Sequence, residues 1–312
     1  MSDIAGIVAP VFALILMGFA AARTRVLDAG GLRGLSDFTF YAGIPALLFG
    51  AVVQAPVLRL LDVAGVYFAG ALAMFALAAA LARWWFGAGL AQAAMVGLNA
   101  SYGNAVMLAL PIVSEGFGAD GLAVLLPVIT LQSVVLLTLT TVLIEAGAHG
   151  AASPWRVLRI TVPSLVRNPV ILALGLALLW RAVGVPLPAP LQRLLALLGA
   201  AAPTLALICL GASLPGLPGR AALREVVLST ALKLVAMPAL IWALTAAAKL
   251  EPFTAAVLVV TAGVPTGANA FFLARRAATQ ALAEASAGTV VAGTALSVLT
   301  LSALLAWARW SG

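Results

Sequence analysis

The feature that most constrains this chain is a series of apolar stretches, each about 20 residues long, that recurs along its whole length. A helix of that length crosses the roughly 30 Å hydrocarbon core of a bilayer. Apolar residues make up 64% of the 312 residues and charged residues only 9%, whereas a soluble domain carries about 25% charged residues. The chain has too few polar residues to cover a surface in water. We therefore expect lipid to be its solvent, which excludes the soluble protein classes.

Breaks in the apolar pattern divide the chain into ten predicted spans. They lie at 4–22, 36–54, 63–82, 91–113 and 121–144 in the first half, and at 168–184, 190–213, 223–247, 252–274 and 286–308 in the second. The spans predict an all-α integral membrane fold, with residues 1–145 as a first five-helix repeat, 146–167 as a cytoplasmic linker and 168–312 as a second repeat. Because five is an odd number, the second repeat must enter the membrane in the opposite orientation, which gives an inverted pair.

Positive charge indicates the orientation of the chain. With the N-terminus outside, eleven of the 17 basic residues fall in cytoplasmic linkers and five fall outside, while Lys233 lies within a span. An excess of Lys and Arg marks the cytoplasmic side, so we expect a multi-pass protein of the bacterial inner membrane with both termini periplasmic. The net charge of +7 then reflects topology and not a nucleic-acid partner. The acidic start, with Asp3 before the first span, favours an uncleaved helix over a signal peptide.

Two predicted spans carry helix-breaking residues at mid-membrane depth. The fourth contains Asn104 followed by Pro111, and the ninth contains Pro265 followed by Asn269. Proline removes a backbone donor, and backbone groups freed inside a membrane must line an enclosed cavity or find partners. Broken helices at matching places in two halves predict a transporter site at the midplane. A packing kink is the alternative for either helix taken alone.

Four motifs resemble those of the auxin efflux carrier family, whose bacterial members include malonate and malate permeases. They are Tyr41–Phe49 in the second span, Asn104–Pro111 in the fourth, Asn168-Pro169 at the start of the sixth and Gly263–Asn269 in the ninth. The likeness covers essentially the whole chain. It implies ten helices in two inverted repeats, with helices four and nine crossing at their broken centres and the substrate carboxylate beside that crossing. It also implies a fold like that of the bile-acid sodium symporters, a scaffold of helices 1, 2, 6 and 7, a moving part of helices 3–5 and 8–10, and a homodimer through the scaffold.

The predicted substrate-binding residues are polar or helix-breaking side chains near the two breaks, together with one lysine. They are Ser101, Asn104, Pro111, Lys233, Pro265, Thr266 and Asn269. The resemblance assigns Asn104, Pro111 and Pro265 to the site, while the amides and hydroxyls can bind a carboxylate without adding a charge. This chain has Asn269 where the plant carriers have a second proline, and it lacks their long central loop. Both departures point to a bacterial member and argue against auxin as the substrate.

Lys233 is the one charge well within a predicted span. A charge inside the membrane is costly and is functional by default. Lys233 could pair with an anionic substrate or hold a carbonyl of the broken region. The alternative is that its stem extends along the helix so that the ammonium reaches the headgroups.

The sequence leaves more than one driving force and substrate open. No carboxylate lies at the centre of a span, and Asp37, at the edge of the second, is the least peripheral. This disfavours proton coupling, which usually relies on a titratable relay in the core. We expect efflux of a mono- or dicarboxylate driven by the membrane potential, and the alternative is Na+ coupling through freed carbonyls and hydroxyls. Malonate, malate, another dicarboxylate and an aromatic acid all fit.

An enzyme would need converging acids, bases, nucleophiles or metal ligands. The chain has one histidine, His149 in the central linker, and one cysteine, Cys209 within a span. We therefore expect no catalytic residue, no metal site and no cofactor beyond the alternative of Na+. The expected partners are a small carboxylate, membrane lipid and a second copy of the chain. Outside transport, a structural or sensory membrane protein is the remaining alternative.

Overall fold

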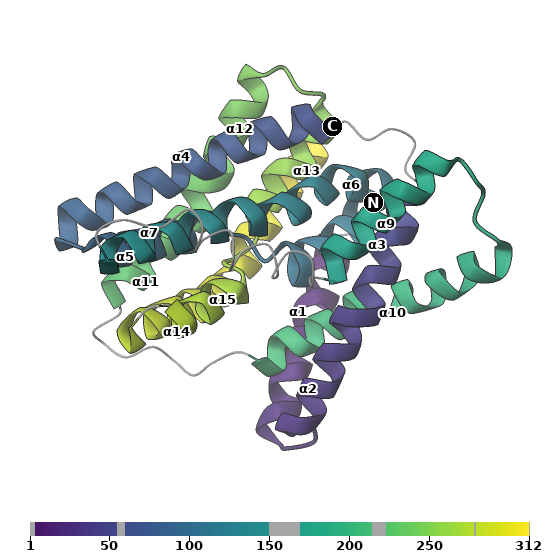
Figure 1. Ribbon diagram of the computed structural model, residues 1–312, viewed down its shortest axis with the longest axis horizontal. Helices are drawn as coiled ribbons and strands as arrows, with labels where there is room; N and C mark the ends of the chain where they lie inside the picture. Colours follow the sequence, from purple (N-terminus) through teal and green to yellow (C-terminus); the bar gives the residue numbers. More distant parts are fainter. Residues whose placement is uncertain (1–3, 55–59, 150–168, 214–222, 278, 312) are drawn as a thin grey trace. The chain divides into compact units, whose positions relative to one another are not determined.

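The computed structural model describes residues 4–54, 60–149, 169–213, 223–277 and 279–311. Every regular element within these residues is helical. Helices satisfy all their backbone hydrogen bonds internally, which suits a chain surrounded by hydrocarbon. The chain divides into two compact units, and each unit takes segments from both halves of the sequence (Figure 1).

The first unit comprises residues 1–59, 106–130 and 163–214. Its described elements are α1 (Ile4–Arg23), α2 (Ala29–Phe38), the π-helix η1 (Thr39–Gly43), α3 (Ile44–Gln54), α9 (Pro169–Val183) and α10 (Ala189–Ser213), with most of η2 (Ala105–Ala109) and of α6 (Leu110–Gln132). Helix α1 packs along α10, and α3 packs against both α9 and α10.

Helices α1 and α10 approach each other closely because a glycine of each faces the backbone of the other. A Cβ on Gly18 would lie 2.0 Å from the carbonyl oxygen of Ile208, and a Cβ on Gly211 would lie 1.8 Å from that of Ile15. No side chain fits at either contact. Small residues that let backbones meet are the usual basis of helix packing in membranes, where lipid removes the hydrophobic drive between helices.

The second unit comprises residues 60–105, 131–162 and 215–312. Its described elements are α4 (Leu60–Phe86), α5 (Leu90–Ser101), η3 (Ser133–Leu137), α7 (Thr138–His149), α11 (Leu223–Ala231), η5 (Leu232–Ala236), α12 (Met237–Ala247), α13 (Pro252–Ala262), α14 (Ala268–Ala277) and α15 (Gln280–Ser311). Helix α5 packs between α4 and α7, α12 packs on α13, and both α11 and α14 pack on α15.

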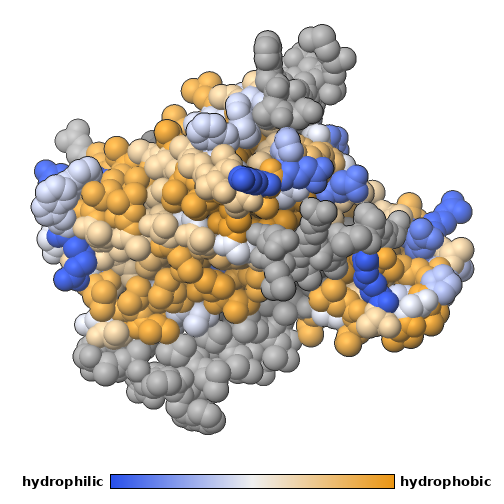
Figure 2. Space-filling view, turned by 90° about the horizontal axis from the view of Figure 1, so that it is seen from above, coloured by the Kyte–Doolittle hydropathy of each residue, from blue (hydrophilic) through white to orange (hydrophobic). Residues whose placement is uncertain are grey.

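Large apolar side chains cover much of the exterior. Leu299 is 71% exposed, Leu197 68% and Val235 64%. Figure 2 shows hydrophobic residues over most of the visible face, with hydrophilic residues in small groups. A soluble monomer seldom exposes such extensive apolar surface, so the exterior fits contact with lipid.

The helices begin and end at places that differ from the predicted spans. The second span begins at Ala29, as α2, because the Asp28 side chain accepts a hydrogen bond from the Gly31 amide at 2.7 Å and caps the helix. The predicted linker between the fourth and fifth spans lies inside α6, where Gly118 forms the kink at φ 65°. A single left-handed glycine therefore replaces an interhelical loop.

Five described helical segments are long and apolar enough to cross a membrane. They are Val63–Phe86, Ala105–Ile144, Ala189–Ala212, Leu223–Ala247 and Gln280–Ala308, with shorter apolar helices at Ala9–Arg23 and Pro252–Ala262. The fold is therefore all-helical and multi-pass. The linker 146–167 lies outside the described residues from residue 150 onward, as does Asn168. The division into 1–145 and 168–312, and the inverted ten-helix repeat, stay predictions.

Candidate functional site

Two helices of the second unit are interrupted, as the sequence predicted. Helix α5 ends at Ser101, and the backbone leaves the helical conformation from Tyr102, which has φ −83° and ψ 109°. Helix α13 ends at Ala262, and α14 begins only at Ala268. Glycine and proline explain both interruptions, since Gly103 lies in the first break and Pro265, which has no amide proton, lies in the second.

The backbones of the two breaks pair with each other. The Asn104 amide donates to the Pro265 carbonyl at 2.8 Å, and the Gly267 amide donates to the Tyr102 carbonyl at 3.1 Å. Gly103 and Thr266 thereby form an isolated antiparallel bridge. Each break donates one hydrogen bond and accepts one. The freed groups thus find partners inside the protein, as a hydrocarbon environment requires.

Side chains from neighbouring helices hold the paired breaks in place. The Thr266 hydroxyl donates to the Asn99 carbonyl at 2.6 Å, and the Gln132 amide donates to the Gly103 carbonyl at 3.0 Å. The Asn99 amide donates to the Ser286 hydroxyl at 3.1 Å, which connects α5 to α15. These bonds link four elements around one point, and all the donors are buried. Buried hydrogen bonds of this kind fix the local geometry.

Lys233 reaches this point from η5. Its side chain is only 1% exposed, and its Nζ donates to the Ala262 carbonyl, at the end of α13, at 2.5 Å. A Cβ placed on Gly103 would lie 3.5 Å from the same Nζ, so the ammonium lies beside both breaks. Lys233 therefore does not extend to the headgroups. Its only described partner is the Ala262 carbonyl, and no described carboxylate pairs with it.

Several buried oxygens around the breaks have no hydrogen-bond partner among the described residues. They include Asn99 Oδ1, Gln132 Oε1 and Thr261 Oγ1. Buried polar atoms without partners are rare in native proteins and usually mark a place where water, an ion or a ligand binds. Together with the ammonium of Lys233, they form a polar cluster that is buried among apolar helices.

Comparison with known proteins identifies the family of the chain. A profile described as membrane transport protein matches residues 3–305. The chain belongs to this family of membrane transporters. The transporter is also 28% identical, over 98% of its own length and 96% of the relative's, to a protein of Rhizobium meliloti (strain 1021) named "Putative malonate transporter". These matches confirm the resemblance to the auxin efflux carriers, and they indicate a transporter and not an enzyme.

The structure brings most of the predicted site residues of the transporter together. Asn104, Pro265 and Thr266 contribute to the pairing of the breaks, and Lys233 lies beside it. Asn269, in the first turn of α14, is exposed and donates to the Tyr102 hydroxyl at 2.9 Å.

Two predicted residues lie differently. The Ser101 hydroxyl donates to the Gly97 carbonyl of its own helix at 2.8 Å. Pro111 is the second residue of α6 and belongs to the segment 106–130 of the first compact unit, so its assignment to the site stays a prediction.

The predicted set omitted three residues that contact the breaks, namely Asn99, Tyr102 and Gln132. Gln132 forms a hydrogen bond between elements far apart in the chain, and its acceptor is a carbonyl of a break. An amide in an otherwise apolar span was the available signal. For Tyr102 the signal was its place next to Gly103 in the broken segment.

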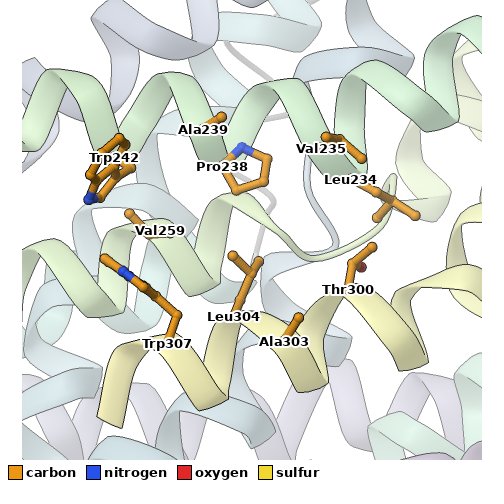
Figure 3. Close-up of a pocket in the computed structure, with 10 residues that line it drawn as sticks. All are labelled: Leu234, Val235, Pro238, Ala239, Trp242, Val259, Thr300, Ala303, Leu304 and Trp307. Carbon is orange, nitrogen blue, oxygen red and sulfur yellow. The ribbon is translucent and has the colours of Figure 1, made fainter. Parts of the chain in front are cut away.

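A separate groove on the second unit is unsuited to an anion. It has a volume of about 420 Å³, opens outward between α12, α13 and α15, and is lined by apolar side chains that include Pro238, Trp242, Leu304 and Trp307 (Figure 3). Thr300 is the one hydroxyl-bearing residue in its lining. Its surface matches hydrocarbon and offers a carboxylate no cation.

Proposed function

We propose that this transporter is a secondary carrier of a small organic anion, a mono- or dicarboxylate, and that the anion binds beside the paired breaks. The observation that carries the proposal is Lys233, a buried ammonium at the breaks with no described carboxylate to neutralise it. A buried charge is stable when it is paired and hydrogen-bonded. The substrate carboxylate would supply the missing partner.

The polarity of the helix ends supports the same location. The C-terminal end of α13 is negative and is occupied by the Lys233 ammonium, while the carbonyl of Gly103 accepts from Gln132. Helix α14 begins at Ala268 with its N-terminal, positive end at the second break. Half-helix N-termini that point at anionic groups near the midplane are a recurring feature of secondary transporters.

The substrate class follows from the relative and from the chemistry of the cluster. The name of the Rhizobium meliloti relative makes malonate the first candidate, and malate, another dicarboxylate and an aromatic acid are the others. A thermal-shift screen of the detergent-purified chain against these acids, followed by uptake into proteoliposomes, tests the proposal. If none of them raised the melting temperature or crossed the membrane, the carrier would need a different cargo.

We further propose ten spans in two inverted repeats, both termini in the periplasm of a bacterial inner membrane, and a homodimer formed through the scaffold. The first compact unit contains the helices of predicted spans 1, 2, 6 and 7, which the resemblance assigns to the scaffold, together with residues 106–130, which it assigns to the moving part. The reciprocal bonds between the breaks agree with a twofold relation between helices four and nine.

The driving force we propose is the membrane potential, with net movement outward. Lys233 already supplies a cation at the carbonyl end of α13, where a coupling ion would otherwise be expected. The alternative, an Na+-coupled symporter of the bile-acid type, is favoured by the unpartnered oxygens of Asn99, Gln132 and Thr261. Replacing Na+ by K+ on both sides of proteoliposomes separates them, because only the symporter would lose transport.

A further inference from the structure

We propose that the carrier accepts its substrate as a single negative charge, so that a dicarboxylate is carried with one of its two carboxyl groups protonated. The inference rests on the proposed function and specifies the ionic form of the cargo. It is drawn from the charge and the hydrogen-bonding character of the cluster around the breaks.

The buried interior of the described chain contains one charge. Among the buried side chains of the described residues, Lys233 is the only ionisable one apart from tyrosines and Cys209, which are neutral when protonated. The other buried polar side chains are neutral amides and hydroxyls such as Asn99, Gln132 and Thr261. One carboxylate beside the Lys233 ammonium would leave the loaded site neutral. A second carboxylate would be an uncompensated charge in a low-dielectric region, which is strongly unfavourable.

The elements packed around Lys233 bring no second described cation to it. On α11, Arg224 is exposed and the half-buried Glu225 accepts a hydrogen bond from Gln92 of α5. Helices α5, α12 and α13 contain no ionisable residue.

The two long helices that contact η5, α4 and α15, also bring no described charged side chain to Lys233. On α4, Arg83 is exposed and Tyr67 is a buried neutral phenol. On α15, Glu284 is exposed. The side chains of Asp62 and Arg309 lie outside the described residues.

The unpartnered atoms also discriminate between the two forms of a second carboxyl group. Asn99 Oδ1 and Gln132 Oε1 are carbonyl oxygens, which only accept hydrogen bonds. An ionised carboxylate also only accepts, so it would face these oxygens without a bond. A protonated carboxyl group has an O–H that can donate to either of them. The neutral form of the second carboxyl group is thus favoured by hydrogen bonding as well as by charge.

The test compares malonate with malonamate, in which one carboxyl group is replaced by a neutral amide that also donates hydrogen bonds. The full chain is reconstituted in proteoliposomes at a clamped membrane potential, and the same pH is set on both sides between about 5 and about 8, a range in which a second carboxyl group loses its proton. Initial rates of the two labelled compounds are measured at concentrations below KM.

We expect the malonate rate to fall by about tenfold per pH unit once the dianion predominates, because the singly protonated fraction falls by that factor. The malonamate rate should fall much less than the malonate rate, since this compound keeps one negative charge throughout and only a change in the protein could slow it. The charge moved per malonate, obtained from the reversal potential, should be one at every pH.

Other outcomes have separate meanings. A malonate rate that is independent of pH, or two charges moved per malonate, would overturn the single-charge inference and leave the anion carrier intact. A malonamate rate that falls in parallel with that of malonate would assign the pH dependence to the protein and would also overturn the inference. If neither compound were bound or carried, the proposed function itself would fail.

Discussion

At the scale of the residue, the position of Lys233 is the main departure from an apolar membrane interior. Several kcal/mol are needed to place an ammonium in a membrane interior without a partner. Here the ammonium donates to the Ala262 carbonyl, which the end of α13 leaves without an intrahelical partner. The ammonium and the carbonyl therefore each provide a hydrogen-bond partner for the other. The arrangement still leaves one positive charge, which is the basis on which we propose an anion as the ligand.

Replacing Lys233 with methionine should weaken malonate binding by about 10- to 100-fold, because a hydrogen bond to a charged group contributes roughly 1.5–3 kcal/mol. Methionine is similar in length, so the helix should still fold. The matched control is Lys249→Met, which removes the same charge from an exposed position just after α12. Equilibrium binding to detergent-purified protein measures both variants. Equal affinities for Lys233→Met and the unmodified chain would exclude Lys233 from the site.

At the scale of the element, the two breaks were predictable and their surroundings were not. Gly103 and Pro265 act on their own backbone, so their effect can be predicted from the local sequence. The π-helical turn η5, in which Lys233 lies, has no comparable local signature, because a π-bulge depends on how a helix packs. The pairing of Gln132 with Gly103 joins residues far apart in the chain, and the sequence alone does not bring them together.

The pairing of the breaks should depend on Gly267. A Cβ there would lie 2.7 Å from a ring carbon of Tyr102 and 3.1 Å from the carbonyl oxygen of Gly103. Gly267→Ala should therefore lower the free energy of unfolding by about 1–3 kcal/mol, as overpacking of an interior does, and should reduce transport. Gly65→Ala, in an open position on α4, is the control and should be neutral or slightly stabilising. Thermal unfolding in detergent compares them, and equal melting temperatures would contradict the pairing.

The close contact of α1 with α10 gives a second prediction at this scale. Gly211→Ala would place a Cβ 1.8 Å from the backbone of Ile15, so the helices would have to separate. We expect a loss of about 3 kcal/mol or more, at the upper end of the cost of overpacking. Gly175→Ala on α9, where no atom lies within 4 Å of the new Cβ, should cost nothing. A Gly211→Ala variant that unfolds at the same temperature as Gly175→Ala would refute the contact.

At the scale of the whole molecule, the two compact units do not follow the two halves of the sequence. Each unit combines helices from both halves. Composition and apolar periodicity identify helices one at a time, so they could predict an all-helical multi-pass chain, while the resemblance to a family came from short motifs. They contain no information on which helices pack together, because these contacts join residues far apart in the sequence.

The rate at which a carrier exports a monoanion should depend on the membrane potential. At about −150 mV inside, the anion gains roughly 3.5 kcal/mol on leaving, which supports a gradient of more than about a hundredfold. Proteoliposomes with a K+ diffusion potential, inside negative, should therefore release malonate faster than depolarised vesicles. Empty vesicles treated identically provide the control. Release that is unchanged by the potential would indicate electroneutral transport.

The reciprocal bonds between the breaks have a mechanical consequence. Each break donates one backbone amide to the other break and accepts one hydrogen bond at a backbone carbonyl. Neither helix can therefore straighten or bend at its centre without breaking these hydrogen bonds. The paired breaks are therefore expected to behave as one rigid unit and not as a hinge. We expect that exposure of a cargo first to one side of the bilayer and then to the other requires displacement of the two paired helices as one body.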